Sequence, residues 1–577
     1  MDRWDGKVAV VTGASSGIGA AIVTELVKFN MVVIGLARRK EQLEAMEKNL
    51  NSKDKKGRFI PYQCDVTKES DVLKCFGWIN STIGAIHVLI NNAGVLRNSK
   101  FSDGNLEDWK CLFDTNVLAV GMCTRQALKS MEAHGVNDGH IVNINSIRSR
   151  YPGIKDGSSW YSASKHAVGV LTDGLRRELA NKKSKIKVSS LNPGGVLTEI
   201  FEKGHITRDP NAAALMPKDV ADSVVYVLST PPNVQGQPRV KNVPQWSFAW
   251  GQKWILLRFK ERSCRRSLHV EIRNKNIVEN SSVRNIVYII SRTANGRGTC
   301  KYTERFFVAK FLLGVLLLTL SWESHYNSTM DAYKGKVAIV TGASAGIGAA
   351  ICKALVREGM IVVGLARREE NIQKMAKELE QYPGKLHARK VDLRNEKEIL
   401  DTFQWIKETF KGGVHVMINN AGLVGNAPLT SGETEKWRNI YEVNVLALNI
   451  CTREAAQSMF ANSIDNGYII NINSISGHRV LPIDGHAMYA ASKHGVTVIS
   501  DALRRELVNK KSRIKVTSIS PGMTATEIFK AANWPVHDPK TPTLQSEDIA
   551  DQVVYLLKTP AHVQITELTI VPVGFQF

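Results

Sequence analysis

The chain repeats itself over a very long period. The segment GKVAVVTGASSGIGAA at residues 6–21 returns as GKVAIVTGASAGIGAA at residues 335–350. A spacing of 328 or 329 residues also separates five identical pairs: Gly13 and Gly342, Asn92 and Asn420, Asn116 and Asn444, Tyr161 and Tyr489, and Lys165 and Lys493. A period this long indicates two tandem domains of one fold and excludes a solenoid of short repeats.

The repeat divides the chain into three parts. Residues 1–235 form copy 1 and residues 330–577 form copy 2, which ends with the apolar segment VQITELTIVPVGFQF. The resemblance of copy 1 to copy 2 ends at Gln235, so copy 1 is predicted to lack its last strand. Residues 236–329 carry 16 Lys and Arg against 5 Asp and Glu. Two interpretations of this segment stay open: translated non-coding sequence that joins two neighbouring genes, or a genuine linker.

Each copy alternates apolar strand patterns with helical patterns. In copy 1 the expected strands lie at 7–13, 31–37, 87–94, 139–146 and 186–194, with helices at 17–29, 69–83 and 161–182 between them. Continuous apolar strands separated by helices predict a parallel sheet that is covered on both faces. The fold class is therefore α/β, with two doubly wound dinucleotide-binding domains in tandem.

The missing last strand predicts an unequal stability of the two copies. In copy 2 this strand would bury Leu568, Ile570, Val571 and Val573, which is worth roughly 6–12 kcal/mol at about 1.5–3 kcal/mol for each side chain. A whole domain has only about 5–15 kcal/mol of stability. Copy 1 must therefore recruit a substitute, and the run KWILLRF at 253–259 is a better candidate than VRNIVYII at 283–290 because it lies closer to Gln235.

The charge distribution, the cysteines and the apolar runs exclude several classes of protein. Of the net charge of +22, the segment 236–329 holds +11 and shows no nucleic-acid-reading motif, so a nucleic-acid partner is not expected. The eight cysteines form no C-x-x-C pair, and we expect neither a disulfide framework nor a metal site. The acidic N-terminus is unlike a signal peptide, which favours the cytoplasm. The apolar run at 306–320 contains Lys310 and is short for a membrane span.

Two patterns, one of glycines and one of arginines, predict the cofactor. Gly13, Gly17 and Gly19 follow a strand and open a helix, where backbone N–H groups and the helix N-terminus favour a pyrophosphate. NAD-binding sheets usually carry an acid after the second strand for the ribose 2′-hydroxyl. Here both copies read LARR, and an arginine at this place favours the 2′-phosphate of NADP. A solvated basic helix start is the alternative reading.

A serine, a tyrosine and a lysine supply candidate acid–base chemistry. Tyr161 and Lys165 stand four residues apart and face the same side of one helix, and Ser146 ends the preceding strand. A lysine cation favours the phenolate and would lower the tyrosine pKa, while the serine hydroxyl bonds the substrate oxygen. A single Tyr-x-x-x-Lys usually marks only a helix face, but copy 2 repeats the set in register.

Together the Gly-rich turn, NNAG, Ser, Tyr-x-x-x-Lys and Pro-Gly segments resemble the short-chain dehydrogenase/reductase family. The resemblance implies two tetrads, in which an asparagine positions a water relay: Asn116, Ser146, Tyr161 and Lys165, and Asn444, Ser474, Tyr489 and Lys493. It also implies NADP(H)-binding positions. In copy 1 these are Gly13, Ser15, Gly17, Ile18, Gly19, Arg38, Arg39, Asp65, Val66, Asn92, Gly94, Pro193 and Thr198. In copy 2 they are Gly342, Ser344, Gly346, Ile347, Gly348, Arg367, Arg368, Asp392, Leu393, Asn420, Gly422, Pro521 and Thr526.

More narrowly, GLARR and SISGHRV resemble the insect farnesol-dehydrogenase-like group and its vertebrate relatives that act on ketosteroids. The resemblance implies an apolar alcohol or carbonyl substrate of the farnesol, retinoid or steroid class. Copy 1 departs from the group at residues 147–160, beside the expected substrate.

A non-catalytic NADP-binding or scaffolding module, with copy 1 inactive, is the alternative function. Family members usually pair through the Tyr-x-x-x-Lys helix, which allows an intramolecular pseudo-dimer or a homo-oligomer. Asp65 and Asp392 can bond the adenine amine or cap a helix.

The arginine after the second strand of copy 2 predicts a cofactor switch. Arg367→Asp places a carboxylate where the 2′-phosphate would sit, so the ratio of the KM values for NADPH and NADH should shift toward NADH. Steady-state kinetics with both cofactors measure the ratio. An unchanged ratio contradicts the assignment of this position to the 2′-phosphate.

Overall fold

The computed structural model describes residues 1–51, 57–149, 157–205, 214–230, 330–481, 483–528 and 542–573. The runs at 253–259, 283–290 and 306–320 lie outside these residues. No described helix combines the length and the apolarity that crossing a bilayer requires.

Copy 1 folds into a parallel sheet whose strands are ordered β3-β2-β1-β4-β5-β6. Its strands are β1 (Val8–Thr12), β2 (Val32–Ala37), β3 (Arg58–Gln63), β4 (Val88–Asn91), β5 (His140–Ile144) and β6 (Lys187–Leu191). Its helices are α1 (Gly17–Lys28), α2 (Lys40–Leu50), α3 (Glu69–Thr82), α4 (Leu106–Phe113), α5 (Ala119–Ala133), α6 (Ser159–Asn181), α7 (Ile200–Lys203) and α8 (Pro217–Ser229). The doubly wound fold is confirmed.

Copy 2 repeats this order and adds a seventh strand, in the order β13-β12-β11-β10-β7-β8-β9. Its strands are β7 (Val337–Thr341), β8 (Ile361–Ala366), β9 (Lys385–Lys390), β10 (Val414–Asn419), β11 (Tyr468–Ile472), β12 (Lys515–Pro521) and β13 (Glu567–Ile570). Its helices are α12 (Gly346–Arg357), α13 (Glu369–Glu378), α14 (Glu396–Thr409), α15 (Thr434–Tyr441), α16 (Leu448–Ala461), α17 (Ala487–Asn509) and α19 (Ser546–Leu557).

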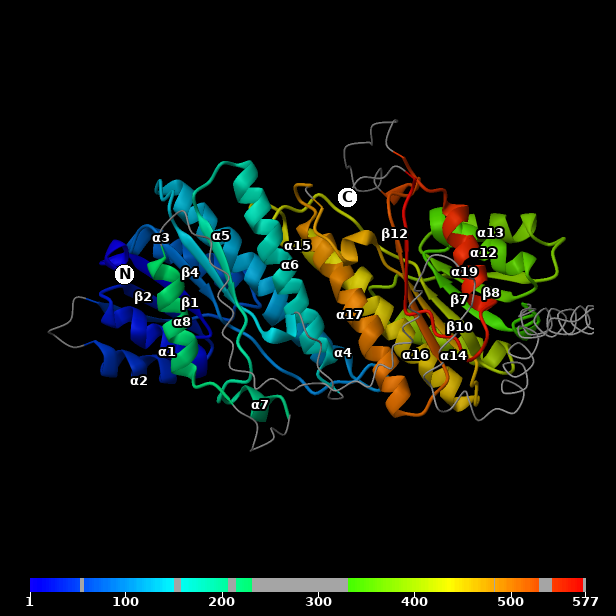
Figure 1. Ribbon diagram of the computed structural model, residues 1–577, viewed down its shortest axis with the longest axis horizontal. Coiled ribbons are helices and arrows are strands. Elements are labelled where there is room, and N and C mark those ends of the chain that lie inside the picture. Colours follow the sequence, from blue (N-terminus) through cyan, green and yellow to red (C-terminus); the bar gives the residue numbers. More distant parts are fainter. Residues whose placement is uncertain are drawn as a thin grey trace, which may run out of the picture. The chain divides into compact units, whose positions relative to one another are not determined.

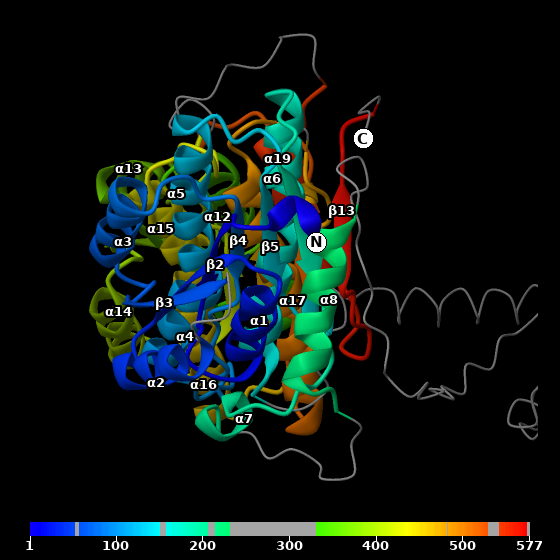
Figure 2. The same ribbon diagram turned by 90° about the vertical axis from the view of Figure 1, so that its left-hand side faces the viewer.

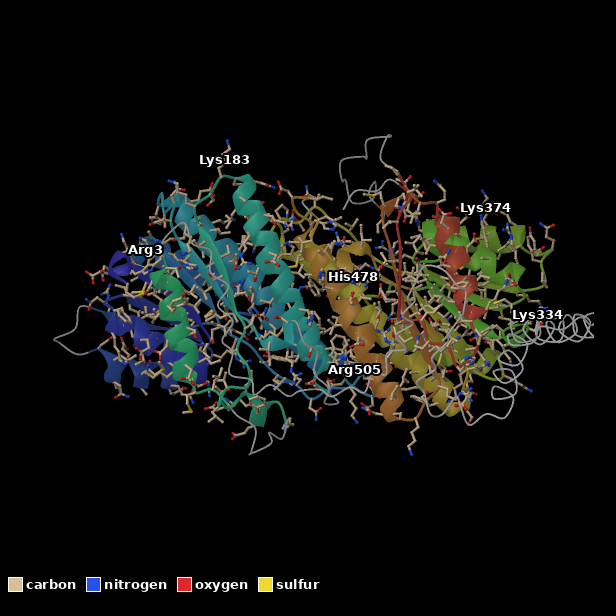
Figure 3. All side chains as sticks on the ribbon, in the orientation of Figure 1. Arg3, Lys183, Lys334, Lys374, His478 and Arg505 are labelled. Carbon is tan, nitrogen blue, oxygen red and sulfur yellow. The ribbon has the colours of Figure 1, made fainter. Side chains whose placement is uncertain are left out.

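Helices cover both faces of each sheet, as the continuous apolar strands require. In copy 1, α1 and α8 lie side by side over one face (Figure 1), while α3, α5 and α6 cover the other. The central strand β1 is buried along its whole length. Figure 2 shows β2 and β4 between α3 and α5 on the left and α1 and α8 on the right. Charged side chains such as Lys183, Lys334 and Lys374 project outward from these layers (Figure 3).

The last strand of copy 2 contributes less burial than the sequence suggested. β13 pairs in parallel with β12, with Leu568 opposite Ile519 and Ile570 opposite Pro521. However, Val573 is 99% exposed, and Leu568, Ile570 and Val571 are only half-buried. The expected 6–12 kcal/mol assumed full burial of four side chains and is therefore too large. The physical reason is that β13 stands at the edge of the sheet, with a neighbour on one side only among the described strands.

The two copies meet through the long helices α6 and α17, which pack along each other. Gly174 of α6 allows a close approach, since a Cβ there would stand 2.4 Å from the Cβ of Ala487. The apolar residues of this side of both sheets belong to one continuous buried cluster.

Buried carboxylates join the copies reciprocally. Glu178 of α6 accepts hydrogen bonds from the backbone N–H groups of Leu429 and Thr430, at 3.0 and 3.1 Å. Glu506 of α17 accepts the equivalent bonds from Phe101 and Ser102, also at 3.0 and 3.1 Å. Burial raises the pKa of Glu178, and these N–H donors oppose the rise. Each copy contributes the equivalent surface to the contact. The contact is therefore isologous, like the interface of a twofold dimer.

A pair of arginines repeats the reciprocity. Arg125 donates to the carbonyl of Gly432 and lies over the ring of Trp437, with 4.9 Å to the centroid. Arg453 donates to the carbonyl of Gly104 at 3.2 Å and lies 5.6 Å from the Trp109 centroid. Each copy therefore carries both halves of the contact.

This reciprocity predicts that residues 330–577 produced alone form a homodimer. Copy 2 holds both Glu506 and the Leu429–Thr430 N–H groups, so two copies of it satisfy each other. Glu506→Ala, present in both subunits, leaves four buried N–H groups unpaired at about 1–3 kcal/mol each and should weaken the dimer at least tenfold. Sedimentation velocity measures the dimer, with the exposed Glu547→Ala as the matched control. A monomeric parent fragment contradicts the prediction.

Candidate active site

The predicted site residues lie at the carboxyl ends of the parallel strands. Gly13 follows β1, Asn92 follows β4, Ser146 follows β5 and Pro193 follows β6. The strand order β1-β4-β5-β6 makes these ends neighbours, so residues far apart in sequence share one edge of the sheet. The same strand ends in copy 2 carry Gly342, Asn420, Ser474 and Pro521.

A threonine that the sequence reasoning missed ties the glycine turn to NNAG. The Thr12 hydroxyl accepts from the backbone N–H groups of Asn92 and Ala93, both at 2.9 Å. The Asn92 side-chain amide donates back to the Thr12 carbonyl at 2.9 Å. Thr341 makes the same contacts with Asn420 and Ala421. The sequence did carry a signal for this contact, because a threonine occupies the same position, Thr12 and Thr341, in both copies.

The glycines are required by close approach. A Cβ on Gly19 would stand 2.2 Å from the Gly13 carbonyl oxygen. Gly17 has φ of +55°, and a Cβ there would lie 3.0 Å from Thr198. Gly346 has φ of +53° and faces Thr526 in the same way. The glycine turn therefore packs closely on the segment that follows β6 in copy 1 and β12 in copy 2.

This turn fits a dinucleotide phosphate. Helix α1 begins at Gly17, and its N-cap Ser16 makes no side-chain capping bond in the part of the chain described. Helix α12 begins at Gly346 behind Ala345, which has no capping group. The first N–H groups of both helices are thus left for an anion. Ile18 and Ile347 lie in these first turns, beside the loop residues Ser15 and Ser344.

The arginine pair follows β2 or β8. Arg39 donates to the hydroxyls of Ser15 and Ser16, at 3.1 and 2.6 Å, and pairs with Glu199 at 3.2 Å. Arg368 pairs with Glu527 at 3.5 Å. The side chains of Arg38 and Arg367 are exposed and, within the described ranges, have no hydrogen-bond or ion-pair partner. They are free to take a phosphate.

Asp65 and Asp392 do not cap helices. Asp65 accepts from the N–H and hydroxyl of Thr67 at 3.1 and 2.8 Å. The Arg394 guanidinium donates a hydrogen bond to Asp392 at 2.7 Å, and this bond lowers the pKa of the Asp392 carboxyl. Helices α3 and α14 have Lys68 and Asn395 as their N-caps instead. Val66 is buried and Leu393 half-buried behind these aspartates.

The asparagine of each predicted tetrad lies in a π-helical turn, Asp114–Leu118 or Glu442–Ala447. The Asn444 carbonyl oxygen accepts from Leu423 N–H at 2.7 Å. Its amide donates to the Leu423 carbonyl and to the Ser492 hydroxyl, both at 2.9 Å. Asn116 makes the same bonds with Val95 and Ser164. Ser164 and Ser492 were not predicted, although both copies share them.

Tyrosine, lysine and serine converge beside this asparagine. The Lys493 ammonium donates to the Ile472 carbonyl at 2.9 Å and lies 5.9 Å from the Tyr489 ring centroid. Lys165 does the same with Ile144 and Tyr161, at 3.0 and 5.8 Å. A Cβ on Gly422 would stand 3.5 Å from the Asn444 carbonyl oxygen and 3.7 Å from the Lys493 nitrogen. Gly94 has the same relation to Asn116 and Lys165.

Burial is the largest influence on the pKa of the tyrosine. Burial raises the pKa of Tyr489 to about 12, opposed by the hydrogen bond with Ser474. Burial also lowers the pKa of Lys493, and that of Lys165, to about 8. The expectation that the lysine lowers the tyrosine pKa stays a prediction for the cofactor-bound enzyme, since the ammonium here donates to a backbone carbonyl.

The two sites differ on the substrate side. In copy 2 the Ser476 hydroxyl and His486 Nε2 are 2.8 Å apart, and the His486 ring lies 5.1 Å from that of Tyr489. Copy 1 has Arg148 and Ser158 at these positions. Burial raises the pKa of Tyr161, while Ser146 and the Arg148 guanidinium oppose the rise. Copy 1 therefore places a cation near its tyrosine where copy 2 has a neutral pair.

Comparisons with known proteins agree with this duplication. A family model described as short chain dehydrogenase matches residues 7–208 and 336–535. Dehydrogenase/reductase SDR family member 11 of Gallus gallus is 48% identical over 254 residues, covering 42% of this chain and 98% of that protein. Farnesol dehydrogenase of Aedes aegypti is 46% identical over 250 residues, covering 43% and 100%. An alcohol dehydrogenase from the archaeon Thermococcus sibiricus, solved with 5-hydroxy-NADP, aligns at 26% identity and a TM-score of 0.37, covering 42% and 99%.

The buried Lys493 predicts a pH-dependent gain in stability on its removal. Holding the charge inside the fold costs stability below the folded pKa of about 8, and the cost disappears as pH rises to the ordinary value of 10.5. Lys493→Met should therefore stabilise the protein at neutral pH by roughly 2 kcal/mol after the loss of the bond to Ile472. Chemical denaturation with the exposed Lys374→Met as control measures this. A gain that persists undiminished above pH 10.5 contradicts the argument.

Proposed function

The chain belongs to the short-chain dehydrogenase family, and from this premise we propose that both copies are NADP(H)-dependent oxidoreductases of apolar alcohols and carbonyl compounds. The observation that carries the proposal is the double occurrence of Asn, Ser, Tyr and Lys beside a glycine turn that fits a dinucleotide. A scaffold that only bound NADP(H) would not need the tyrosine hydroxyl and the serine hydroxyl bonded to each other in both copies.

The roles follow from the contacts in copy 2. Bound NADP(H) would accept or supply the hydride. The Ser474 hydroxyl orients the substrate oxygen beside Tyr489. In oxidation the Tyr489 phenolate takes the proton of the alcohol, and in reduction the phenol returns it to the carbonyl oxygen. With the cofactor bound, Lys493 would hold the ribose and stabilise the phenolate by its charge. Asn444 positions a water between Lys493 and solvent.

The choice of NADP over NAD rests on the residues after the second strand. Neither copy carries an acid directly after LA, and two arginines stand there. Arg38 and Arg367, whose side chains have no hydrogen-bond or ion-pair partner among the described residues, are the proposed contacts of the 2′-phosphate. Arg39 and Arg368 support the same pocket from the start of α2 and α13.

The substrate class follows from the relatives and from the residues near each tyrosine. One relative is named a farnesol dehydrogenase, and a long apolar alcohol is the class we propose for copy 2. The neutral Ser476–His486 pair is compatible with an uncharged substrate. Copy 1, with Arg148 near Tyr161, is proposed to prefer a more polar one. The reciprocal contact of α6 with α17 supports an intramolecular pseudo-dimer.

Tyrosine variants test the proposal in the full chain. Tyr161→Phe, Tyr489→Phe and the double variant keep the ring but remove the proton. We expect each single variant to keep the turnover of one copy, and the double variant to lose at least about a hundredfold in kcat with NADPH affinity nearly unchanged. NADPH oxidation with farnesal, retinal and a ketosteroid measures kcat, and fluorescence titration measures binding.

Two outcomes separate the alternatives. Undiminished turnover in the double variant would refute the assigned chemistry. NADPH binding without turnover of any substrate by the parent chain would favour a non-catalytic NADP-binding module instead. Lys374→Met, an exposed position on α13, serves as the control variant and should leave both kcat and NADPH affinity unchanged.

A further inference from the structure

Copy 1 carries a cation beside its tyrosine that no described residue balances. Arg148 is half-buried, and within the described ranges its guanidinium has no hydrogen-bond or ion-pair partner. Burial lowers the pKa of Arg148, and Tyr161 is the group that opposes this shift. Because burial raises the pKa of Tyr161, that phenol is uncharged at neutral pH. A partly buried charge normally has a counter-ion, and among the described residues Arg148 has none.

The backbone around Arg148 is fixed, so that the side chain is the part available to a ligand. The Arg148 N–H donates to the Ser146 hydroxyl at 3.2 Å. The N–H and the hydroxyl of Ser149 both donate to the Ser146 carbonyl, at 3.0 and 2.7 Å. The His166 ring forms a hydrogen bond with the Arg148 carbonyl. These bonds hold Arg148 beside the serine of the predicted tetrad.

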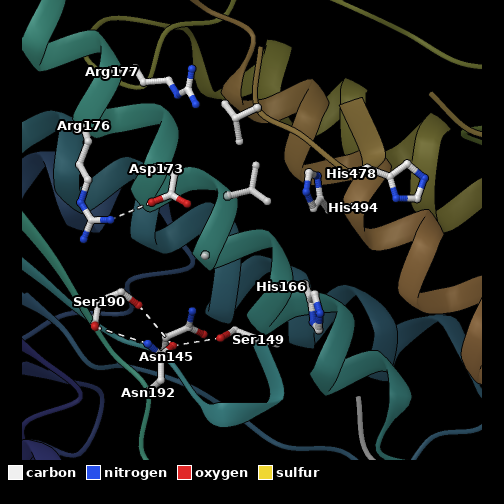
Figure 4. A pocket seen from close by; sticks show the side chains of 13 residues that line it. Asn145, Ser149, His166, Asp173, Arg176, Arg177, Ser190, Asn192, His478 and His494 are labelled. Carbon is white, nitrogen blue, oxygen red and sulfur yellow. Dashed lines mark hydrogen bonds and ion pairs between the residues drawn. The ribbon is translucent and has the colours of Figure 1, made fainter. Parts of the chain in front are cut away.

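Arg148 does not serve the cavity between the two copies. This cavity, of about 430 Å³, is lined from α6 and α17. Figure 4 shows Asn145, Ser149 and His166 on its wall, and Arg148 is not among its lining residues. The electrostatic contact of Arg148 is instead with Tyr161. The guanidinium therefore belongs to the tyrosine side of copy 1.

Copy 2 fills the same position with a neutral pair. Ser476 takes the place of Arg148, and its hydroxyl lies 2.8 Å from His486 Nε2. Both side chains are buried, and burial lowers the pKa of His486 to about 4, so that this ring is neutral. The His486 ring in turn lies 5.1 Å from the Tyr489 ring. The position thus lies near the tyrosine in both copies and carries a charge in copy 1 alone.

A second arginine at this edge of the copy 1 sheet is already paired. Arg97 follows NNAG at the position of Gly425 in copy 2. Its guanidinium pairs with Asp108 at 3.3 Å and donates to the Leu96 carbonyl at 3.0 Å. Arg97 therefore needs no further anion, whereas Arg148 does.

We propose that copy 1 acts on short oxo acids and the corresponding hydroxy acids, whose carboxylate pairs with Arg148. The inference rests on the proposed oxidoreductase function and names the substrate class of copy 1. A guanidinium can hold a carboxylate through two parallel hydrogen bonds. The carbonyl oxygen of the same molecule would then be bound by Ser146 and Tyr161.

The reaction leaves the carboxylate unchanged. In reduction the carbonyl carbon gains a hydride from NADPH, which is oxidised to NADP⁺, and the carbonyl oxygen gains the proton of Tyr161. The C=O group becomes CH–OH, and Tyr161 regains its proton from water. The reverse step oxidises the hydroxy acid. The pair with Arg148 only orients the substrate.

Steady-state kinetics of the full chain with Tyr489→Phe, in which copy 2 is silenced, test the proposal. The probes are 2-oxobutanoate and 4-oxopentanoate, each against its neutral methyl ester. At least one acid should exceed its ester in kcat/KM by roughly tenfold, and Arg148→Ser should remove this preference, mainly through KM. Arg148→Lys keeps the positive charge and should retain part of it. Arg58→Ser, at an exposed arginine that begins β3, is the matched control and should leave the preference unchanged.

Binding without turnover separates this inference from the proposed chemistry. In the full chain with both Tyr161→Phe and Tyr489→Phe, saturated with NADPH, calorimetry should show the preferred acid binding and Arg148→Ser weakening it roughly tenfold. If the parent chain turns over no carbonyl compound, the proposed function fails, while such binding would still support the carboxylate site. Equal use of acid and ester by copy 1, or an equal effect of Arg148→Ser on both, would overturn the inference and leave the proposed function in place.

Discussion

Parallel strand pairing is the constraint on which both predicted sites depend. A parallel ladder puts every carboxyl end at the same edge of the sheet, and each crossover needs a helix on one face. In copy 1 this brings Gly13, Asn92 and Ser146 to neighbouring strand ends, although a long stretch of sequence separates the first from the last. The hydroxyl of Thr12 then fixes the first two of these segments to each other.

The contact between the copies acts on the same helices that carry the predicted chemistry. Tyr161 and Lys165 lie on α6, and Glu178 on the same helix is held by N–H groups of copy 2. Glu506 holds α17 in the reciprocal way. A buried carboxylate that accepts two N–H bonds stabilises one helix position, and its loss leaves both donors unpaired. Each copy therefore positions the tyrosine helix of the other.

Small sequence differences between the copies have large local effects because the backbones are so alike. Replacement of the Ser476–His486 pair by Arg148 and Ser158 puts a cation near one tyrosine and a neutral pair near the other. Pairing of β13 with β12 in copy 2 adds Glu567 beside Ser520 at the end of β12. Because the two copies have the same fold, the difference between the two sites comes from their side chains and not from their backbones.

The sequence alone determined the duplication, the parallel fold and the segments that form the predicted site, because apolar periodicity and glycine spacing are local patterns. It also identified Asn116, Ser146, Tyr161 and Lys165 through a family resemblance. Only the tertiary structure decided the rest. Burial, which depends on the whole fold, raises the pKa of Tyr489 against the expected effect of Lys493. The exposure of Val573, the Thr12 bridge and the reciprocal carboxylates likewise depend on which residues meet across the fold, and no local pattern specifies that.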